Sequence, residues 1–288
     1  IQQDINAFRA SLVYDCRERA MYRVEGGSVY SADGGPTAGT ISAGDSLAAL
    51  DEIVFNQKLL TMEQVLHAMS TNYEDMETVP AGPEIRAILL NKAPKFGNDD
   101  ERADKWVVEL EDYIGSSYRY KYRSSKYGKG PVPCCYSYSQ SPVTGNIAFG
   151  KSIGATPDGR KDGQPVNNGI SPANGSEKKG ATAACNSVMK LPSIWFQKGA
   201  IFNMRLSKGA LDTDENKEKV IAMIKVLFEN YGQQIQFNVV DNKVFKKAME
   251  QPDEYKDLMV RVSGYSALFT SLSPECQMDV INRAELEL

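Results

Sequence analysis

One segment carries more information than any other in the chain: Val260-Arg261-Val262-Ser263-Gly264-Tyr265-Ser266-Ala267-Leu268-Phe269. An apolar strand pattern leads to Gly264, an aromatic residue follows directly, and the last residue of the sequence is 24 positions further on. One interpretation is a tight turn after a strand, in which glycine adopts a backbone conformation that other residues avoid. On the local pattern alone this interpretation is the better one.

A second interpretation of this segment is special to glycine. A radical at Cα needs a planar centre without a crowding Cβ, and the flanking amide groups delocalise the unpaired electron. The radical would persist in an apolar place that excludes water and oxygen. We expect Val262, Leu268 and Phe269 to bury Gly264 in such a place.

The last third of the chain alternates between strand and helix patterns around this segment. Strand patterns cover 200–206, 234–240 and 258–262, and helix patterns cover 213–231 and 241–250. A terminal helix begins at Ser273, an N-cap residue, with Pro274 in its first turn. Such alternation predicts an α/β architecture.

The first half of the chain is mainly helical in pattern. We expect helices over 1–24, 45–58, 84–91 and 99–122, and one that begins at the capping box of Thr61 and Gln64. Short strand candidates are Val29, Tyr30 and Ile41. Residues 130–180 are rich in glycine, proline, asparagine and serine, and about 50 residues are too many for a passive connector. These loops are expected to pack against a site or a partner element.

Composition excludes several classes of function. The 288 residues include 33 Lys and Arg against 37 Asp and Glu, a formal net charge of −4, so no basic footprint for nucleic acid is expected. No apolar stretch reaches the roughly 18 residues that span a bilayer. The sequence begins at Ile1 within a helical pattern, without a signal peptide, and we expect it to be the later part of something longer.

Cysteine and histidine are too few for metal or triad chemistry. The chain has one histidine, His67, and its five cysteines include no C-x-x-C pair. A zinc site and a histidine-dependent triad therefore lack their parts. An odd number of irregularly spaced cysteines favours reduced thiols in a cytoplasm over disulfides. We interpret His67 and all five cysteines as structural: Cys16, Cys134, Cys135, Cys185 and Cys276.

The segment around Gly264 resembles the signature of the glycyl radical enzymes, and other segments resemble that family in the expected order. Any one piece is weak, but the ordered set extends from roughly residue 20 to 288. The segments are Gly44-Asp45-Ser46-Leu47-Ala48-Ala49, Lys95-Phe96-Gly97-Asn98-Asp99-Asp100, Ala155-Thr156-Pro157-Asp158-Gly159-Arg160, Gly169-Ile170-Ser171-Pro172, Gly180-Ala181-Thr182-Ala183-Ala184-Cys185-Asn186-Ser187, Gln236-Phe237-Asn238-Val239-Val240, Arg261-Val262-Ser263-Gly264-Tyr265 and Asp279-Val280-Ile281-Asn282-Arg283.

The resemblance implies a fold and a modified residue. The fold would be the C-terminal half of a ten-stranded α/β barrel with surrounding helices. Residues 1–150 would belong to the large catalytic domain and 151–288 to the glycine radical domain, with the radical loop near 261–267. Gly264 would lose a Cα hydrogen to a 5′-deoxyadenosyl radical made by a separate iron–sulfur, S-adenosylmethionine-dependent activating enzyme. No bound cofactor or metal is implied. The residues expected to support the loop are Arg261, Val262, Ser263, Tyr265, Ser266 and Ala267.

The family's thiyl cysteine is not matched in this chain. In the family, the glycyl radical takes hydrogen from a cysteine on a facing loop, well upstream of the segment that begins at Gly44. Cys134 and Cys135 come after that segment, and Cys135 lies only 129 residues before Gly264, so we expect both to sit in a strand of the barrel wall. The glutamate two residues after the family's cysteine is missing with it. Tyr30 is one candidate for substrate contact, or else a packed strand aromatic.

The expected reaction is a radical elimination that cleaves a C–O, C–N or C–S bond of a small organic substrate. Within the family, an aryl-acetate decarboxylase and a fumarate-adding synthase are alternatives. Two hypotheses come from other classes: a non-catalytic radical-bearing subunit that docks on a separate polypeptide, and a plain α/β binding protein in which Gly264 is only a turn. The resemblance also implies a homodimer in the cytoplasm of an anaerobic bacterium, with the missing N-terminal part of the same enzyme as a partner, and no nucleic-acid or membrane partner.

Overall fold

A computed structural model describes residues 6–25, 27–29, 32–120, 135–136, 138–141, 143–283 and 285–286. Its helices are α1 (Ala7–Ser11), α2 (Tyr14–Arg19), α3 (Thr40–Ala49), α4 (Met62–Ser70), α5 (Gly82–Asn91), α6 (Glu101–Tyr120), α7 (Gly145–Lys151), α8 (Gly180–Met189), α9 (Asp214–Glu229), α10 (Asn242–Glu250) and α11 (Pro274–Ile281). Its strands are β1 (Ala32–Asp33), β2 (Cys135–Tyr136), β3 (Asn203–Arg205), β4 (Gln236–Asn238), β5 (Met259–Arg261) and β6 (Ser266–Leu268).

Parallel strand pairs form the framework of the molecule. Strand β1 pairs with β2, and β3 pairs with β4, both in parallel. Isolated parallel bridges extend these pairs, since Pro36 pairs with Ser139 and Gln140 pairs with Ala200. The order of neighbours is therefore β1, β2, β3, β4, and helices lie between successive strands in the sequence. This arrangement confirms the predicted α/β class.

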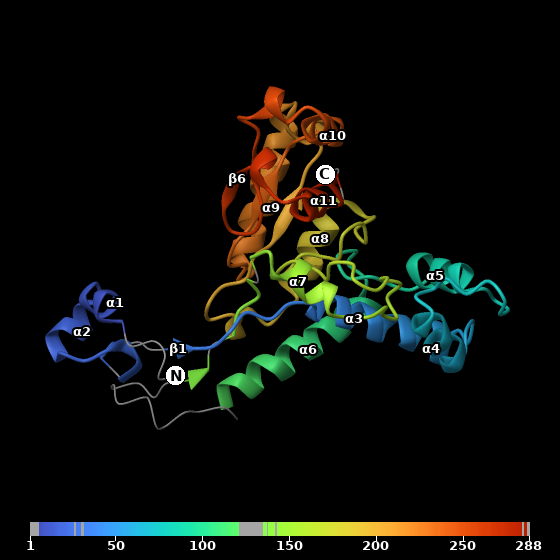
Figure 1. Cartoon of the computed structure of the whole chain (residues 1–288), viewed down its shortest axis with the longest axis horizontal. Coiled ribbons are helices and arrows are strands. Elements are labelled where there is room, and N and C mark those ends of the chain that lie inside the picture. The colour runs from blue at the N-terminus through green and yellow to red at the C-terminus, as the bar shows by residue number, and fades with distance from the viewer. Residues whose placement is uncertain are drawn as a thin grey trace.

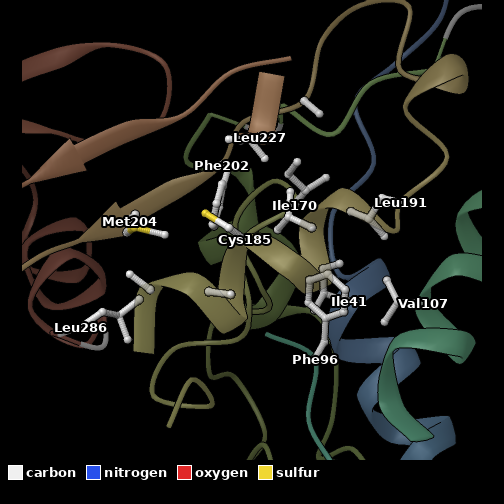
Figure 2. Packing of buried hydrophobic residues seen from close by; sticks show 14 of the residues in the cluster. Ile41, Phe96, Val107, Ile170, Cys185, Leu191, Phe202, Met204, Leu227 and Leu286 are labelled. Carbon is white, nitrogen blue, oxygen red and sulfur yellow. The ribbon is translucent and has the colours of Figure 1, made fainter. Parts of the chain in front are cut away.

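Three clusters of buried apolar side chains hold these elements together. The largest joins α3, α6, α8, β3 and α9, and Figure 2 shows Cys185 within it near Phe202. A second lies between α4, α5 and a π-helical continuation of α3 over Leu50–Asn56. The third lies among α10, α11 and the β5–β6 hairpin, which Figure 1 shows at the end of the molecule opposite α6. The hairpin thus has an apolar base of its own.

Most of the predicted elements are confirmed. The predicted helix over 45–58 corresponds to the later part of α3 and Leu50–Asn56, and helices over 84–91, 99–122, 213–231 and 241–250 correspond to α5, α6, α9 and α10. The capping box at Thr61 is present, and Ser273 caps α11. Predicted strands over 200–206, 234–240 and 258–262 correspond to the shorter β3, β4 and β5. None of the helices in the described residues is long and apolar enough to cross a membrane.

Three local predictions are wrong. The helix expected over 1–24 is split into α1 and α2, because Val13 is extended and Ala20 ends α2 in the left-handed conformation. Ile41, a strand candidate, lies in α3 and is buried. The hydroxyl of Thr40 donates to Glu111 on α6 and so holds the start of α3 against α6. Val29, another strand candidate, lies in a bend and not in one of the strands of the described residues. The strand candidate Tyr30 lies outside the described residues.

Candidate active site at the Gly264 turn

Gly264 lies at the tip of an antiparallel hairpin. Strands β5 and β6 pair so that Arg261 is opposite Ser266, and the Val262 N–H donates to the Tyr265 carbonyl oxygen at 2.9 Å. The backbone of Gly264 has φ +79°, in the left-handed region. A side chain is strained in this conformation. The predicted glycine turn is therefore present, and the strand after it is an element that the sequence pattern missed.

One side of Gly264 faces a neighbouring strand and a cavity. A Cβ placed on Gly264 would lie 3.0 Å from Cδ1 of Ile201, just before β3. The cavity beside it has a volume of about 790 Å³. Its lining comes from three stretches of chain and the hairpin: Ser141, Ser193, Ile194, Phe196, Gln197, Lys198, Gly199, Ala200, Ile201, Gln233, Gln234, Arg261 and Gly264.

The expectation that apolar neighbours bury Gly264 is wrong for this structure. Val262 and Phe269 are buried, but Leu268 is 41% exposed and Gly264 itself is exposed. The reason is the alternation of side chains along the strands. Val260 and Val262 face the apolar cluster with α10 and α11, whereas Leu268 pairs with Met259 on the opposite face. The strands that carry the turn thus pack on the apolar cluster with α10 and α11, and the turn itself is exposed to the cavity.

The side chain of Gln236 on β4 holds the turn from the barrel side. Its Oε1 accepts from the Gly264 N–H at 3.1 Å and from Nε of Arg261 at 3.2 Å. Its Nε2 donates to Oδ1 of Asn203 on β3. The Asn203 N–H in turn donates to Oγ of Ser171 at 2.8 Å. A chain of neutral polar groups therefore joins the loop at Ser171 to the peptide group of Gly264.

Asn238 attaches β5 to β4 in the way that a strand backbone would. Its Nδ2 donates to the Arg261 carbonyl oxygen at 2.8 Å, and its Oδ1 accepts from the Arg261 N–H at 2.8 Å. The guanidinium of Arg261 continues across the hairpin, since Nη1 donates to Oγ of Ser266 at 3.0 Å. Both strands of the hairpin are thereby tied to the framework just before the turn.

A buried ion pair supports the turn from the side of α11. Nη2 of Arg283 donates to the Val262 carbonyl oxygen at 2.7 Å and contacts Oδ2 of Asp279 at 3.1 Å. Nη1 of Arg283 donates to the Arg261 carbonyl oxygen at 3.2 Å. Oδ1 of Asp279 accepts from Nδ2 of Asn146 at 3.0 Å. Because both charged groups are buried and hydrogen-bonded to their surroundings, this pair fixes the backbone directly before Gly264.

Ser263 provides a further anchor to a loop. Its hydroxyl donates to Oδ1 of Asn168 at 2.8 Å, and Nδ2 of Asn168 donates to the Val143 carbonyl oxygen. Ser263 is 2% exposed, so this bond is shielded from water. The loop-rich segment that contains Asn168 and Ser171 therefore packs against the turn, as the sequence analysis expected.

The structure places the other predicted support residues around the same turn. Arg261, Val262, Ser263 and Ser266 make the contacts described above. Tyr265 is 38% exposed and contributes its carbonyl oxygen, and Ala267 pairs with Val260 on the apolar face. Tyr30 lies outside the described residues, so its substrate contact stays a prediction.

The described cysteines lie on elements other than the Gly264 hairpin. The backbone of Cys135 lies in β2, and Cys134 lies outside the described residues. None of the described thiols lines the cavity at Gly264. Burial raises the pKa of the Cys185 thiol to about 12, so this group stays protonated and unreactive. His67 contacts Asp75 at 2.9 Å on the surface beside α4. Within the described part of the chain, no group of acidic, cysteine and histidine side chains has the arrangement of a metal site.

The residues of this site that received no individual role from the sequence include these five: Asn168, Asn203, Gln236, Asn238 and Arg283. Gln236 and Asn238 carry one usable signal, because two polar side chains at alternate positions of an apolar strand share one face. Four of the five lie in or beside the segments that resemble the family. Their contacts with the turn depend on pairings between distant elements, which local pattern does not specify.

Comparison with known proteins places the chain in a family. The family model "Pyruvate formate lyase-like" matches residues 4–149, and the model "Glycine radical" matches residues 166–270, which include the Gly264 turn. The chain belongs to the glycyl radical enzyme family.

Relatives in this family share the sequence and the fold. The chain is 37% identical over 278 residues to "Probable dehydratase YbiW" of Escherichia coli and 34% identical over 280 residues to "Trans-4-hydroxy-L-proline dehydratase" of Clostridioides difficile. The glycerol-bound B12-independent glycerol dehydratase of Clostridium butyricum superposes with a TM-score of 0.87 at 35% identity over 98% of this chain and 34% of that one. The chain covers 34% and 33% of the two relatives, with 96% of its own length. The expected barrel fold of the family is confirmed by this superposition.

Proposed function

We propose that Gly264 stores the glycyl radical of a lyase that cleaves a C–O, C–N or C–S bond. The observation that carries the proposal is the glycine at the tip of the hairpin, held by hydrogen bonds on both flanks and open to a cavity of 790 Å³. A 5′-deoxyadenosyl radical from an S-adenosylmethionine-dependent activating enzyme would take one Cα hydrogen. The products are 5′-deoxyadenosine and an unpaired electron on the Cα of Gly264.

The proposed catalytic cycle moves one hydrogen atom at a time. The radical at Gly264 takes the hydrogen of a cysteine thiol outside this chain, which restores glycine and leaves a thiyl radical. The thiyl radical takes a hydrogen from a substrate carbon, and the substrate radical loses its leaving group together with a proton. The remaining radical takes the hydrogen back from the thiol, and the thiyl radical recovers its hydrogen from Gly264. The cavity beside Gly264 is where we place the loop that carries this cysteine.

Among the three bonds, we favour cleavage of a C–O bond of the substrate. The two named relatives and the superposed enzyme are described as dehydratases, so elimination of water from a small hydroxylated substrate is the leading reaction. The alternatives within the family are decarboxylation of an aryl acetate and addition to fumarate. Assays of the activated enzyme with different substrates separate these reactions. A diol or trans-4-hydroxy-L-proline would lose water, an aryl acetate would release carbon dioxide, and toluene plus fumarate would give an adduct. Release of carbon dioxide, or of an adduct alone, would contradict the dehydratase assignment.

A second candidate is a radical-bearing subunit that docks on a separate polypeptide with the cysteine. The observation in its favour is that none of the described thiols lines the cavity at Gly264. Denaturing electrophoresis of the native material distinguishes the two. A single band much longer than 288 residues supports one continuous enzyme, whereas a stoichiometric second band supports a split one. In both cases we place the enzyme, as a homodimer, in an oxygen-free cytoplasm, because oxygen destroys carbon radicals.

The oxygen reaction also tests the position of the radical. Anaerobic activation followed by exposure to air should cut the chain at Gly264, and mass spectrometry of the fragments locates the break. Protein that was never activated serves as the control and should remain intact. Activated protein that survives air, or breaks elsewhere, would overturn the assignment of Gly264.

A further inference from the structure

We infer that Gln236 is a positioning residue whose side-chain oxygen holds the amide group of Gly264 for radical formation and storage. The inference rests on the proposed function, because it gives Gln236 a role in the same reaction. Its basis is the bond from the Gly264 N–H to Oε1 of Gln236 at 3.1 Å. Gln236 lies on a framework strand and not on the hairpin, so the bond joins the reacting residue to a rigid support.

The orientation of the Gln236 amide follows from its neighbours. The backbone N–H of Gly264 and Nε of Arg261 both point at Oε1, and these groups only donate. Nε2 of Gln234 also reaches Oε1, at 3.4 Å. On the other side, Nε2 of Gln236 donates to Oδ1 of Asn203. The reverse orientation would set donors against donors, so the oxygen must face Gly264.

The support behind Gln236 is itself rigid. Asn203 stands directly opposite Gln236 in the parallel pairing of β3 and β4. Its backbone N–H and its Nδ2 both reach Oγ of Ser171, at 2.8 and 3.4 Å. Ser171, Asn203 and Gln236 are between 5% and 6% exposed. Water therefore does not compete for these bonds, and each member limits the rotation of the next.

The bond matters because of what a Cα radical needs. Its stability comes from electron donation by the amide nitrogen and withdrawal by the carbonyl group, and both require the peptide groups to be aligned with Cα. Glycine alone imposes no such alignment, since it has the widest backbone freedom of any residue. An acceptor on the Gly264 N–H fixes that peptide plane and increases electron density on the nitrogen. A neutral amide oxygen does this without adding a charge beside the radical.

The test compares two replacements of Gln236 in the native enzyme. Gln236→Glu keeps an oxygen acceptor for the Gly264 N–H, whereas Gln236→Leu is of similar size and has none. The matched control is Gln277→Leu, because Gln277 is also buried (9% exposed) and its Nε2 bonds only to the Phe269 carbonyl oxygen below the hairpin. This control lowers stability without touching the amide of Gly264.

The first readout needs no radical. Amide hydrogen exchange at Gly264 in the resting enzyme should be slow in the wild type, in Gln236→Glu and in Gln277→Leu. In Gln236→Leu it should be faster by roughly tenfold, the factor that corresponds to a hydrogen bond of about 1.4 kcal/mol. Equal exchange in Gln236→Leu and the wild type would overturn the inference.

The second readout is specific to the radical. Electron–nuclear double resonance of the activated enzyme in D₂O measures the exchangeable amide deuteron of Gly264, whose quadrupole coupling reports its hydrogen bond. We expect one coupling for the wild type, Gln236→Glu and Gln277→Leu, and a larger one with a radical decay roughly fivefold faster for Gln236→Leu. Identical couplings in all four proteins would refute the positioning role.

The two readouts separate failure of the inference from failure of the proposed function. If the wild type gives no radical at all, the proposed function fails, and amide exchange still decides whether Gln236 holds Gly264. If Gln236→Leu does not fold, Asn203→Leu is the second variant, because it removes the acceptor behind Gln236 and the Nδ2 contact with Ser171 but leaves Gln236 in place. We expect an intermediate increase in exchange at Gly264 for this variant, and unchanged exchange would count against the relay.

Discussion

The Gly264 turn and the crossing of α3 with α6 are both rich in buried polar groups, but of different kinds. The turn is held mainly by neutral amides and hydroxyls, with a single ion pair between Arg283 and Asp279. The helix crossing buries three carboxyl groups, namely Asp45 on α3 and Asp104 and Glu111 on α6. The proposed radical site is thus held mainly by neutral groups, whereas the helix crossing contains carboxyl groups whose pKa is raised by burial.

The acids at the helix crossing show why this difference matters. Burial raises the pKa of Glu111, although Thr40, Tyr138 and Gln140 all donate to its oxygens. Burial likewise raises the pKa of Asp45 to about 7, against the opposing charge of Lys95. Groups of this kind beside a radical would change its surroundings with every protonation step. We expect the stability of the fold to depend on pH more strongly than the radical does.

The largest expected effect separates two glycines that have the same backbone φ. Gly264 and Gly175 both have φ +79°, and a Cβ at Gly175 would meet no atom within 4 Å. Alanine at either position costs about 1–2 kcal/mol of backbone strain. Gly264→Ala should abolish the radical signal in electron paramagnetic resonance, because a Cβ would crowd the planar radical centre and lie 3.0 Å from Cδ1 of Ile201, whereas Gly175→Ala should retain it.

The contrary result is equally clear. A radical signal of normal intensity in Gly264→Ala would show that the radical does not require glycine at this position. Loss of the signal in both variants would show that backbone strain, and not the identity of the residue at position 264, decides the outcome. Thermal unfolding of both variants shows whether their strain is similar.

The second effect tests the one ion pair of the turn. Arg283→Met leaves Asp279 buried without its partner and removes the donors to the Arg261 and Val262 carbonyl oxygens. Loss of one partner of a buried pair costs about 3–5 kcal/mol. The control is Lys151→Met, which breaks an exposed contact with Glu275 on α11, the helix that carries Asp279, and should leave the urea midpoint almost unchanged. Urea unfolding measures the free energy of unfolding of both variants. Equal midpoints would show that the buried ion pair stabilises the fold no more than the exposed one.

The third effect concerns pH and the helix crossing. Burial raises the pKa of Asp45 to about 7 in the folded state, whereas the unfolded chain releases this proton near the ordinary pKa of 3.8. Between these values the folded state binds more protons, so stability falls as pH rises. From pH 5 to 7 this contribution amounts to about 2 kcal/mol. Asp45→Asn should flatten the curve over that range, because the amide does not titrate.

The matched control for this prediction is Asp162→Asn, at an exposed turn position. It should leave the pH dependence of unfolding unchanged. If Asp45→Asn and the wild type lose stability in parallel between pH 5 and 7, another group causes the dependence. Over the same range, the yield of radical per folded molecule should stay constant in the wild type, because the turn is held mainly by neutral groups.

Much of the fold could be predicted from the sequence, because strong local signals were present. The capping box at Thr61, the cap at Ser273 and the apolar period of α6 each act within a few residues. Where the signal depended on context, the prediction was wrong. The apolar period over 1–24 continues through Val13, but the backbone there is extended, since periodicity does not register a break between two short helices.

The site was predictable only at its centre. Gly264 and its neighbours stand out in one continuous stretch, and the hairpin that they form is local. Gln236 lies 28 residues from Gly264 in sequence and contacts it only because β4 packs beside β5. Arg283 reaches Val262 from beyond α11 for a similar reason. The exposure of Gly264 also depends on tertiary packing. The strand pattern shows which side chains alternate between the two faces, but it does not show which other elements cover the tip of the hairpin.

The most direct test of the central claim is the radical spectrum of the anaerobically activated native enzyme, prepared with ordinary glycine and with glycine deuterated at Cα. A radical on the Cα of Gly264 keeps one hydrogen, so ordinary protein should give a doublet in electron paramagnetic resonance. The deuterated protein should give a collapsed single line, and Gly264→Ala should give neither. A doublet that deuteration leaves unchanged, or no paramagnetic signal from fully activated protein, would contradict the account.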